Sequence, residues 1–180
     1  AKEFFGTEGQ LVVISAPTGE IMRVLYGAGN IGQDEFGPVR CGNLATRLRS
    51  GLYEFQSLPD DWDESLAAIG WGLGAYKFDR YLKDKKAFPV LKIAQLDNAD
   101  EIDNLITAVH LGRDLINTPS NDMGPIALES AARSLASEFS ATVSVIEGED
   151  LITQNYPMIH AVGRAAHEEP RLVQVNWGDD

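Results

Sequence analysis

The sequence predicts an α/β protein in two parts joined by one long helix. Short runs rich in β-branched residues alternate with amphipathic helical patterns along the chain. Residues 1–96 read as a small N-terminal mixed α/β domain, and residues 97–118 read as a connecting helix. From 119 to 180 the order helix, strand, helix, strand predicts the start of a parallel α/β domain with a right-handed crossover.

Composition restricts the class of protein. Hydrophobic residues make up 44% of the 180 residues and charged residues 23%, as in folded globular proteins. Fifteen basic and 27 acidic residues give a net charge of -12. Such a surface repels phosphate backbones and anionic lipids, so neither nucleic acid nor a membrane is an expected partner.

The single cysteine, Cys41, excludes an internal disulfide framework and fits a reducing compartment. No apolar run approaches the roughly 20 residues of a membrane span, and the start shows no signal-peptide pattern. We therefore expect a cytoplasmic protein. The chain lacks an initiator Met, so we expect its start to be cut or processed.

Four strands are predicted in the first domain. The first two form a hairpin around the turn Pro17-Thr18-Gly19, and the acidic stretch 33–38 is expected to be a loop. The predicted strands are residues 11–15, 20–26, 51–56 and 88–94.

Directly after the second strand stands GAGNIG, Gly27 to Gly32, a match to the dinucleotide-binding pattern G-x-G-x-x-G. In that pattern the glycines let the backbone approach a pyrophosphate at a helix N-terminus. Here Gly37 and Pro38 interrupt the position of that helix, and no acidic strand end follows about 20 residues on. A glycine-rich turn is the favoured interpretation, and nucleotide binding is the alternative.

A helix is predicted after Pro59, because acidic residues open it and apolar residues recur at helical spacing. The expected buried stripe is Leu66, Ile69, Leu73 and Tyr76. Glycines inside a helix cost stability, so three of them predict very close packing: Gly70, Gly72 and Gly74. Trp71 is expected in the core. The basic residues Lys83, Lys85 and Lys86 are expected to lie on a solvated loop rather than a nucleic-acid patch.

The connecting helix has the clearest periodicity in the chain. Asn98 is the expected N-cap, with Glu101 completing a capping box. One apolar face carries Ile102, Leu105, Ile106, Val109 and Ile116. Gly112 lies on the same face and is predicted to be a point of close backbone approach.

The segment HLGRDLINTPSNDMGP, His110 to Pro125, is a predicted corner between two helices. Pro119 ends the first helix near Asn117, and Gly124-Pro125 starts the second. His110 and Asp114 stand four apart and could in principle hold a metal, but a third ligand is missing.

Other polar residues also receive structural roles. Asn117, Asn121 and Asp122 are interpreted as turn and cap residues of the corner. Four further residues have no second residue at the sequence spacing of a metal-ligand pair or a catalytic triad, and they also receive structural roles: Cys41, Trp62, His160 and His167. No catalytic, cofactor-binding or metal-binding residue is assigned.

Four blocks, in order and spacing, resemble the leucyl aminopeptidase (cytosol aminopeptidase) family. They are RDLINTPSNDMGP, ALESAARSL, VSVIEGEDL and HAVGRAAHEEPRLVQVNW, and the upstream GWGLGAYKFDRY is similar to the last helix of that family's shorter N-terminal domains. The resemblance implies a variable N-terminal domain followed by a catalytic α/β domain, which two strands in residues 119–180 would leave incomplete.

The resemblance also implies an exopeptidase with two divalent metal ions, zinc or manganese, which bind the α-amine and scissile carbonyl and activate a water. The family's ligands and catalytic residues lie in the blocks G-K-G-x-x-x-D-x-G-G and N-T-D-A-E-G-R-L, which do not occur in this sequence. We therefore expect a segment of a peptide-hydrolysing enzyme that is inactive by itself. The resemblance further implies a homohexamer, and some members bind DNA. A non-catalytic interaction or assembly module is the alternative.

Overall fold

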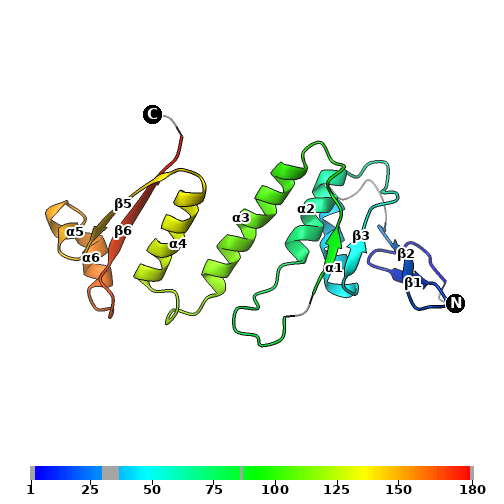
Figure 1. Ribbon diagram of the computed structural model, residues 1–180, viewed down its shortest axis with the longest axis horizontal. Helices are drawn as coiled ribbons and strands as arrows, with labels where there is room; N and C mark the ends of the chain where they lie inside the picture. Colours follow the sequence, from blue (N-terminus) through cyan, green and yellow to red (C-terminus); the bar gives the residue numbers. More distant parts are fainter. Residues whose placement is uncertain (1–2, 30–36, 86, 179–180) are drawn as a thin grey trace. The chain divides into compact units, whose positions relative to one another are not determined.

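The computed structural model describes residues 3–29, 37–85 and 87–178 (Figure 1). The chain divides into two compact units, residues 1–112 and 113–180. The division falls inside the long helix α3 (Ala99–Asn117), which corresponds to the predicted connecting helix. The domain boundaries given above remain a prediction.

The N-terminal hairpin is confirmed. β1 (Leu11–Ser15) pairs antiparallel with β2 (Ile21–Tyr26), beginning with Leu11 opposite Tyr26. The turn closes where the Gly19 N–H donates to the carbonyl oxygen of Ala16 at 2.9 Å. Gly19 has φ +87°, a left-handed conformation that glycine adopts without steric cost.

Two short helices follow that the sequence did not predict. The 3-10 helix η1 (Pro38–Cys41) leads directly into α1 (Gly42–Arg47). Pro38 occupies a first-turn position, where its missing N–H costs no helical hydrogen bond. The loop expected at residues 33–38 falls mostly outside the described residues.

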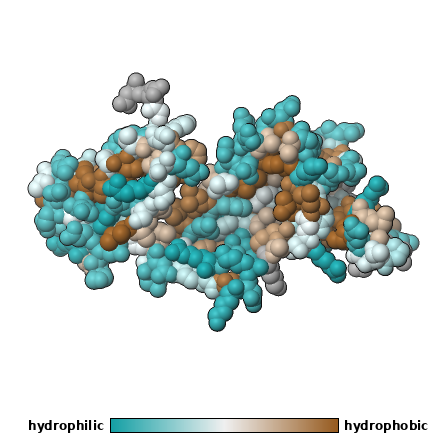
Figure 2. Space-filling model, viewed as in Figure 1, coloured by the Kyte–Doolittle hydropathy of each residue, from teal (hydrophilic) through white to brown (hydrophobic). Residues whose placement is uncertain are grey.

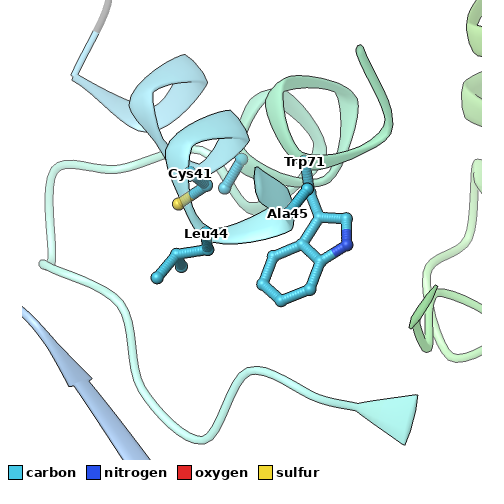
Figure 3. Packing of buried hydrophobic residues seen from close by; sticks show 5 residues of the cluster. Cys41, Leu44, Ala45 and Trp71 are labelled. Atoms are coloured by element: carbon cyan, nitrogen blue, oxygen red, sulfur yellow. The ribbon is translucent and has the colours of Figure 1, made fainter. Parts of the chain in front are cut away.

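The first unit has a core formed by five buried residues: Cys41, Leu44, Ala45, Ala67 and Trp71 (Figure 3). Two of them lie on α2 (Glu64–Gly74), whose N-terminus is capped by the Asp63 side chain. The Trp71 indole N–H also donates to the carbonyl oxygen of Pro89 at 3.1 Å, so this ring is anchored as well as buried. The predicted core role of Trp71 is confirmed.

The predicted buried stripe of α2 is partly wrong. Leu66 is 42% exposed, whereas Ala67 is completely buried. The small residues of this helix face its neighbours, because they allow the backbones to come closer than leucine would.

The predicted close packing at the α2 glycines is confirmed. A Cβ on Gly70 would lie 2.4 Å from the carbonyl oxygen of Val39, and one on Gly74 would lie 2.2 Å from that of Gly42. A Cβ on Gly72 would lie 2.2 Å from Cδ1 of Ile106 on α3. Any side chain at these positions would push α2 away from η1, α1 or α3.

The remaining strands of the first unit form a parallel pair. β3 (Gly51–Tyr53) pairs with β4 (Pro89–Leu91), and α2 lies between them in the chain. Both strands lie within ranges predicted to be strands, and their pairing was not predicted.

Helix α3 ends at Asn117 as predicted, but its apolar face is not uniformly covered. Ile102 is 2% exposed, whereas Leu105 is 45% and Ile116 is 82% exposed. A Cβ on Gly112 would meet no atom within 4 Å. The predicted close approach at Gly112 is therefore wrong, because this glycine faces open space.

The described part of the second unit contains the end of α3, three further helices and two strands. α4 (Pro125–Glu138) packs on the sheet of β5 (Thr142–Glu147) and β6 (Arg171–Asn176). Between the strands lie α5 (Asp150–Thr153) and α6 (Pro157–Gly163). The sequence predicted all of these except α6, which starts at a proline.

The pairing of β5 with β6 corrects the predicted parallel arrangement. The two strands are antiparallel, with Thr142 opposite Asn176 and Glu147 opposite Arg171. The Gly148 N–H donates to the carbonyl oxygen of Pro170 at 2.9 Å. The chain thus returns through α5 and α6 to the end of β5 that it left, without the crossover that a parallel pair requires.

Apolar side chains are interspersed with polar ones on the face shown in Figure 2. The most exposed large apolar residues on helices of the second unit are Ile116, Met158 and Val162, at 82%, 75% and 82%. No helix within the described residues is long and apolar enough to cross a membrane.

Candidate functional site

The corner between α3 and α4 is built by local hydrogen bonds. Thr118 is buried, and its hydroxyl donates to the carbonyl oxygen of Asp114 at 2.6 Å. The N–H groups of Asp122 and Met123 both donate to the carbonyl oxygen of Pro119 at 2.9 Å. The predicted break and restart of the helix are therefore confirmed.

The carboxylate of Glu168, distant in the sequence, also binds at this corner. The Ile126 N–H in the first turn of α4 donates to Glu168 Oε2 at 2.9 Å. A Cβ on Gly124 would lie 2.6 Å from the same oxygen, so glycine there makes room for the carboxylate. A negative charge at a helix N-terminus is stabilising. Sequence reasoning missed this contact, because 42 residues separate its partners.

His110 contacts two other residues of the first unit, Gly72 and Tyr76. Its Nε2 lies 3.0 Å from the carbonyl oxygen of Gly72, a distance at which the Nε2–H tautomer donates a hydrogen bond. Its ring centroid lies 5.2 Å from that of Tyr76. His110 thus links α3 to α2 and to the segment that follows it.

The described residues do not bring together a ligand set for the two implied metal ions. Among residues 3–29, 37–85 and 87–178, no group of three or more His, Cys, Asp or Glu side chains could hold a metal ion. His110 and Asp114 gain no third ligand there.

The described part of the GAGNIG motif packs against the chain itself. A Cβ on Gly27 would lie 2.0 Å from the carbonyl oxygen of Thr7. The Gly29 N–H donates to the carbonyl oxygen of Gly6 at 3.0 Å, and Gly29 has φ +74°. Glycine is therefore required at the first two glycine positions of the pattern because the chain's own backbone approaches them closely. The rest of the motif, residues 30–32, lies outside the described residues.

Of the four other residues considered from the sequence, Cys41 and Trp62 belong to the first unit and His160 and His167 to the second. Burial raises the pKa of the Cys41 thiol to about 11, so it stays protonated at neutral pH. Trp62 packs against the core, and His167 is exposed. His160 Nε2 lies 3.3 Å from Glu149 Oε1.

An ion pair in the second unit was also missed. Arg171 on β6 pairs through Nη1 with Glu129 Oε2 on α4, and these side chains are only 10% and 14% exposed. Hydrogen bonds from Arg133 and then from Arg171 lower the pKa of the Glu129 carboxyl. The pair joins the helix to the sheet.

Family comparison follows the same division of the chain. Residues 1–94 match the M17 aminopeptidase N-terminal domain, and residues 110–180 match the catalytic domain of the cytosol aminopeptidase family. The chain belongs to the cytosol aminopeptidase family. The resemblance seen in the sequence blocks is thereby confirmed.

The probable cytosol aminopeptidase of Syntrophotalea carbinolica is one curated relative of this chain. It is 29% identical over 204 residues, which cover 98% of this chain and 41% of the relative. That of Roseiflexus castenholzii is 31% identical over 137 residues, covering 67% of this chain and 28% of the relative. That of Corynebacterium glutamicum is 27% identical, covering 77% and 29%.

Solved structures agree with the fold. The cytosol aminopeptidase of Coxiella burnetii is 36% identical and matches with a TM-score of 0.82 over 98% of this chain and 38% of that one. The bottromycin maturation enzyme BotP in complex with Mn matches with a TM-score of 0.78 at 22% identity, over 97% of this chain and 40% of that one, which shows the fold alone. The family member described here thus spans well under half the length of these relatives.

Proposed function

We propose that this chain is a segment of a metal-dependent aminopeptidase that removes N-terminal residues from peptides. The observation that carries the proposal is the match to both family domains in one order, at residues 1–94 and 110–180. The 36% identity to the Coxiella burnetii cytosol aminopeptidase over 98% of the chain supports it.

The segment is proposed to supply scaffold rather than catalytic groups. The described residues offer no set of three metal ligands, and the two sequence blocks that carry the family's ligands are absent. Two divalent ions, zinc or manganese, would therefore be bound by residues outside these 180. Manganese is named for the relative BotP.

The test compares two proteins: the full-length product of the reading frame that contains this chain, and the 180-residue chain alone. Each is incubated with leucine p-nitroanilide and either Mn²⁺ or Zn²⁺, and release of p-nitroaniline is followed. We expect metal-dependent hydrolysis, lost with EDTA, from the full-length protein and none from the segment.

N-acetyl-leucine p-nitroanilide serves as the control substrate, because an aminopeptidase requires a free α-amine. Hydrolysis of the acetylated substrate at the same rate would contradict the exopeptidase assignment. Activity of the segment alone would contradict its proposed scaffold role.

A second candidate is an assembly module in the cytosol, which the exposed apolar side chains favour. Met158 and Val162 lie four residues apart on α6 and are 75% and 82% exposed, and contiguous exposed apolar surface often marks an interaction site. A homohexamer is the proposed assembly of the full protein. Light scattering after gel filtration tests it, and a monomeric full-length protein would exclude it.

A further inference from the structure

The connection between α2 and β4 is a long exposed loop. Its described residues, 75–85 and 87–88, form neither helix nor strand. Connections of this length without regular structure are uncommon in compact domains and are usually either functional or linker segments. The loop is held at both ends, by the Trp71 indole on Pro89 and by the Tyr76 ring on His110.

Between these anchors the loop is shaped by its own side chains. The rings of Phe78 and Tyr81 pack edge to face, with centroids 5.8 Å apart. The Arg80 guanidinium lies 5.8 Å from the centroid of the Tyr81 ring. The Leu82 N–H donates to the carbonyl oxygen of Asp79 at 2.9 Å, which closes a turn. The loop therefore presents a defined surface.

That surface differs in charge from the rest of the chain. Residues 77–85 carry two carboxylates and four cations: Lys77, Arg80, Lys83 and Lys85. This is a net positive segment in a chain of net charge -12. Tyr81 and Leu82, beside these cations, are 51% and 48% exposed. Arginine and tyrosine beside exposed apolar surface are typical of protein interfaces.

We propose that residues 77–85 are a docking surface for an acidic peptide segment of another protein that also carries an apolar side chain. Its carboxylates would pair with Lys83 and Lys85, and its apolar side chain would pack on Leu82, beside Tyr81. Lys85 already pairs with Asp79 at 3.1 Å while its side chain remains 65% exposed, so it can exchange one carboxylate for another.

Single-stranded nucleic acid fits this surface less well. Base stacking needs open ring faces. Arg80 lies over Tyr81, and Lys77 lies 5.6 Å from the centroid of Phe88. The net charge of -12 also repels a long polyanion, whereas a short peptide interacts mainly within a Debye length of about 10 Å at 0.1 M salt.

The experiment measures fluorescence anisotropy with the full-length protein and a short glutamate-leucine peptide. Fluorescein on the peptide N-terminus removes the free amine, so binding does not depend on the proposed aminopeptidase centre. We expect saturable binding that weakens as salt rises from about 0.01 to 0.15 M, because the Debye length falls from about 30 to 8 Å.

Two variants and two matched controls locate the site. We expect the double variant Lys83→Glu/Lys85→Glu to weaken binding by about tenfold and Leu82→Ser by about threefold. Lys92→Glu reverses an exposed charge outside the loop, and Met22→Ser removes a side chain that is 71% exposed on β2. Both controls should change the affinity less than about twofold, and all variants should keep the wild-type circular dichroism spectrum.

Three results would overturn the proposal. The first is that the peptide does not bind the wild-type protein at low salt. The second is that Lys92→Glu lowers the affinity for the peptide as much as the double variant does. The third is that the wild-type protein binds oligothymidylate more tightly than the peptide. Such oligothymidylate binding, if lost in the Lys83→Glu/Lys85→Glu variant, would identify the loop as a nucleic-acid site.

Discussion

Arg171 on β6 and Glu129 on α4 form an ion pair with side chains that are only 10% and 14% exposed. Arg171 Nη1 also lies 3.3 Å from Glu147 Oε2 on β5, and Arg133 Nε donates to Glu129 Oε1 at 2.7 Å. The cluster thus joins α4 to both strands. Breaking a largely buried pair costs more than forming it contributes, because the remaining Arg171 charge keeps only the more exposed carboxylate of Glu147.

Glu129→Gln should therefore destabilise the second unit. We expect its melting temperature to fall by roughly 5 °C, because the amide cannot balance the charge of Arg171. The matched control is Glu138→Gln on the same helix, since Glu138 is exposed. Differential scanning calorimetry makes the comparison, and equal melting temperatures for the two variants would contradict a stabilising pair.

The same carboxylate predicts how stability depends on pH. Hydrogen bonds from Arg133 and from Arg171 hold the pKa of Glu129 below its usual 4.5 in the folded protein. A lowered folded pKa contributes stability that is present above pH 4.5 and is lost as pH falls through the folded value. Urea unfolding between pH 6 and about pH 3 should show wild type losing more stability than Glu129→Gln. Equal losses of stability in the two proteins would contradict the lowered pKa of Glu129.

The local structure of the chain was largely predictable from sequence. The hairpin of β1 and β2 and the corner at Pro119 follow from turn residues, proline and periodicity, which act over a few positions. The helices η1 and α1 were missed because neither has a long apolar repeat. Helix α6 was missed because it is short, spanning only Pro157–Gly163.

Contacts between distant positions could not be predicted in the same way. Periodicity identifies a strand without giving the direction of its partner, so the antiparallel pairing of β5 with β6 was missed. Gly72 and Gly112 both lie inside helices, yet a Cβ would meet another helix at Gly72 and no atom within 4 Å at Gly112. Glu168 and Arg171 find their partners on α4 only through the tertiary fold.

Two glycines provide a matched test of helix packing. A Cβ on Gly70 would lie 2.4 Å from the carbonyl oxygen and 2.6 Å from Cα of Val39, and backbone cannot yield as a side chain can. Gly70→Ala should destabilise the first unit by about 1–3 kcal/mol. Gly112→Ala should stabilise by about 0.5–1 kcal/mol, because alanine favours helix and meets no atom. Urea titration measures both, and a Gly70→Ala variant as stable as wild type would refute the packing at Gly70.

Cys41 reports on the integrity of the first core. It is 2% exposed, and burial raises the pKa of its thiol to about 11 from a usual 9.0. Only the thiolate attacks Ellman's reagent, so native protein at pH 8 should react very slowly. Urea should expose one fast-reacting thiol per chain, because the chain has one cysteine. The urea concentration at which half of this thiol reacts rapidly should equal the midpoint of unfolding.

The raised thiol pKa of Cys41 also affects stability in alkali. The folded state holds this proton more tightly than the unfolded state, so the contribution is fully present below pH 9 and is lost as pH rises towards 11. Cys41→Ala should remove this loss, while creating a smaller core side chain that lowers stability at every pH. Chemical denaturation of both proteins at pH 7.5 and pH 10 separates the two effects. Rapid labelling of native Cys41 at pH 8 would show that the core of Cys41, Leu44 and Trp71 opens readily.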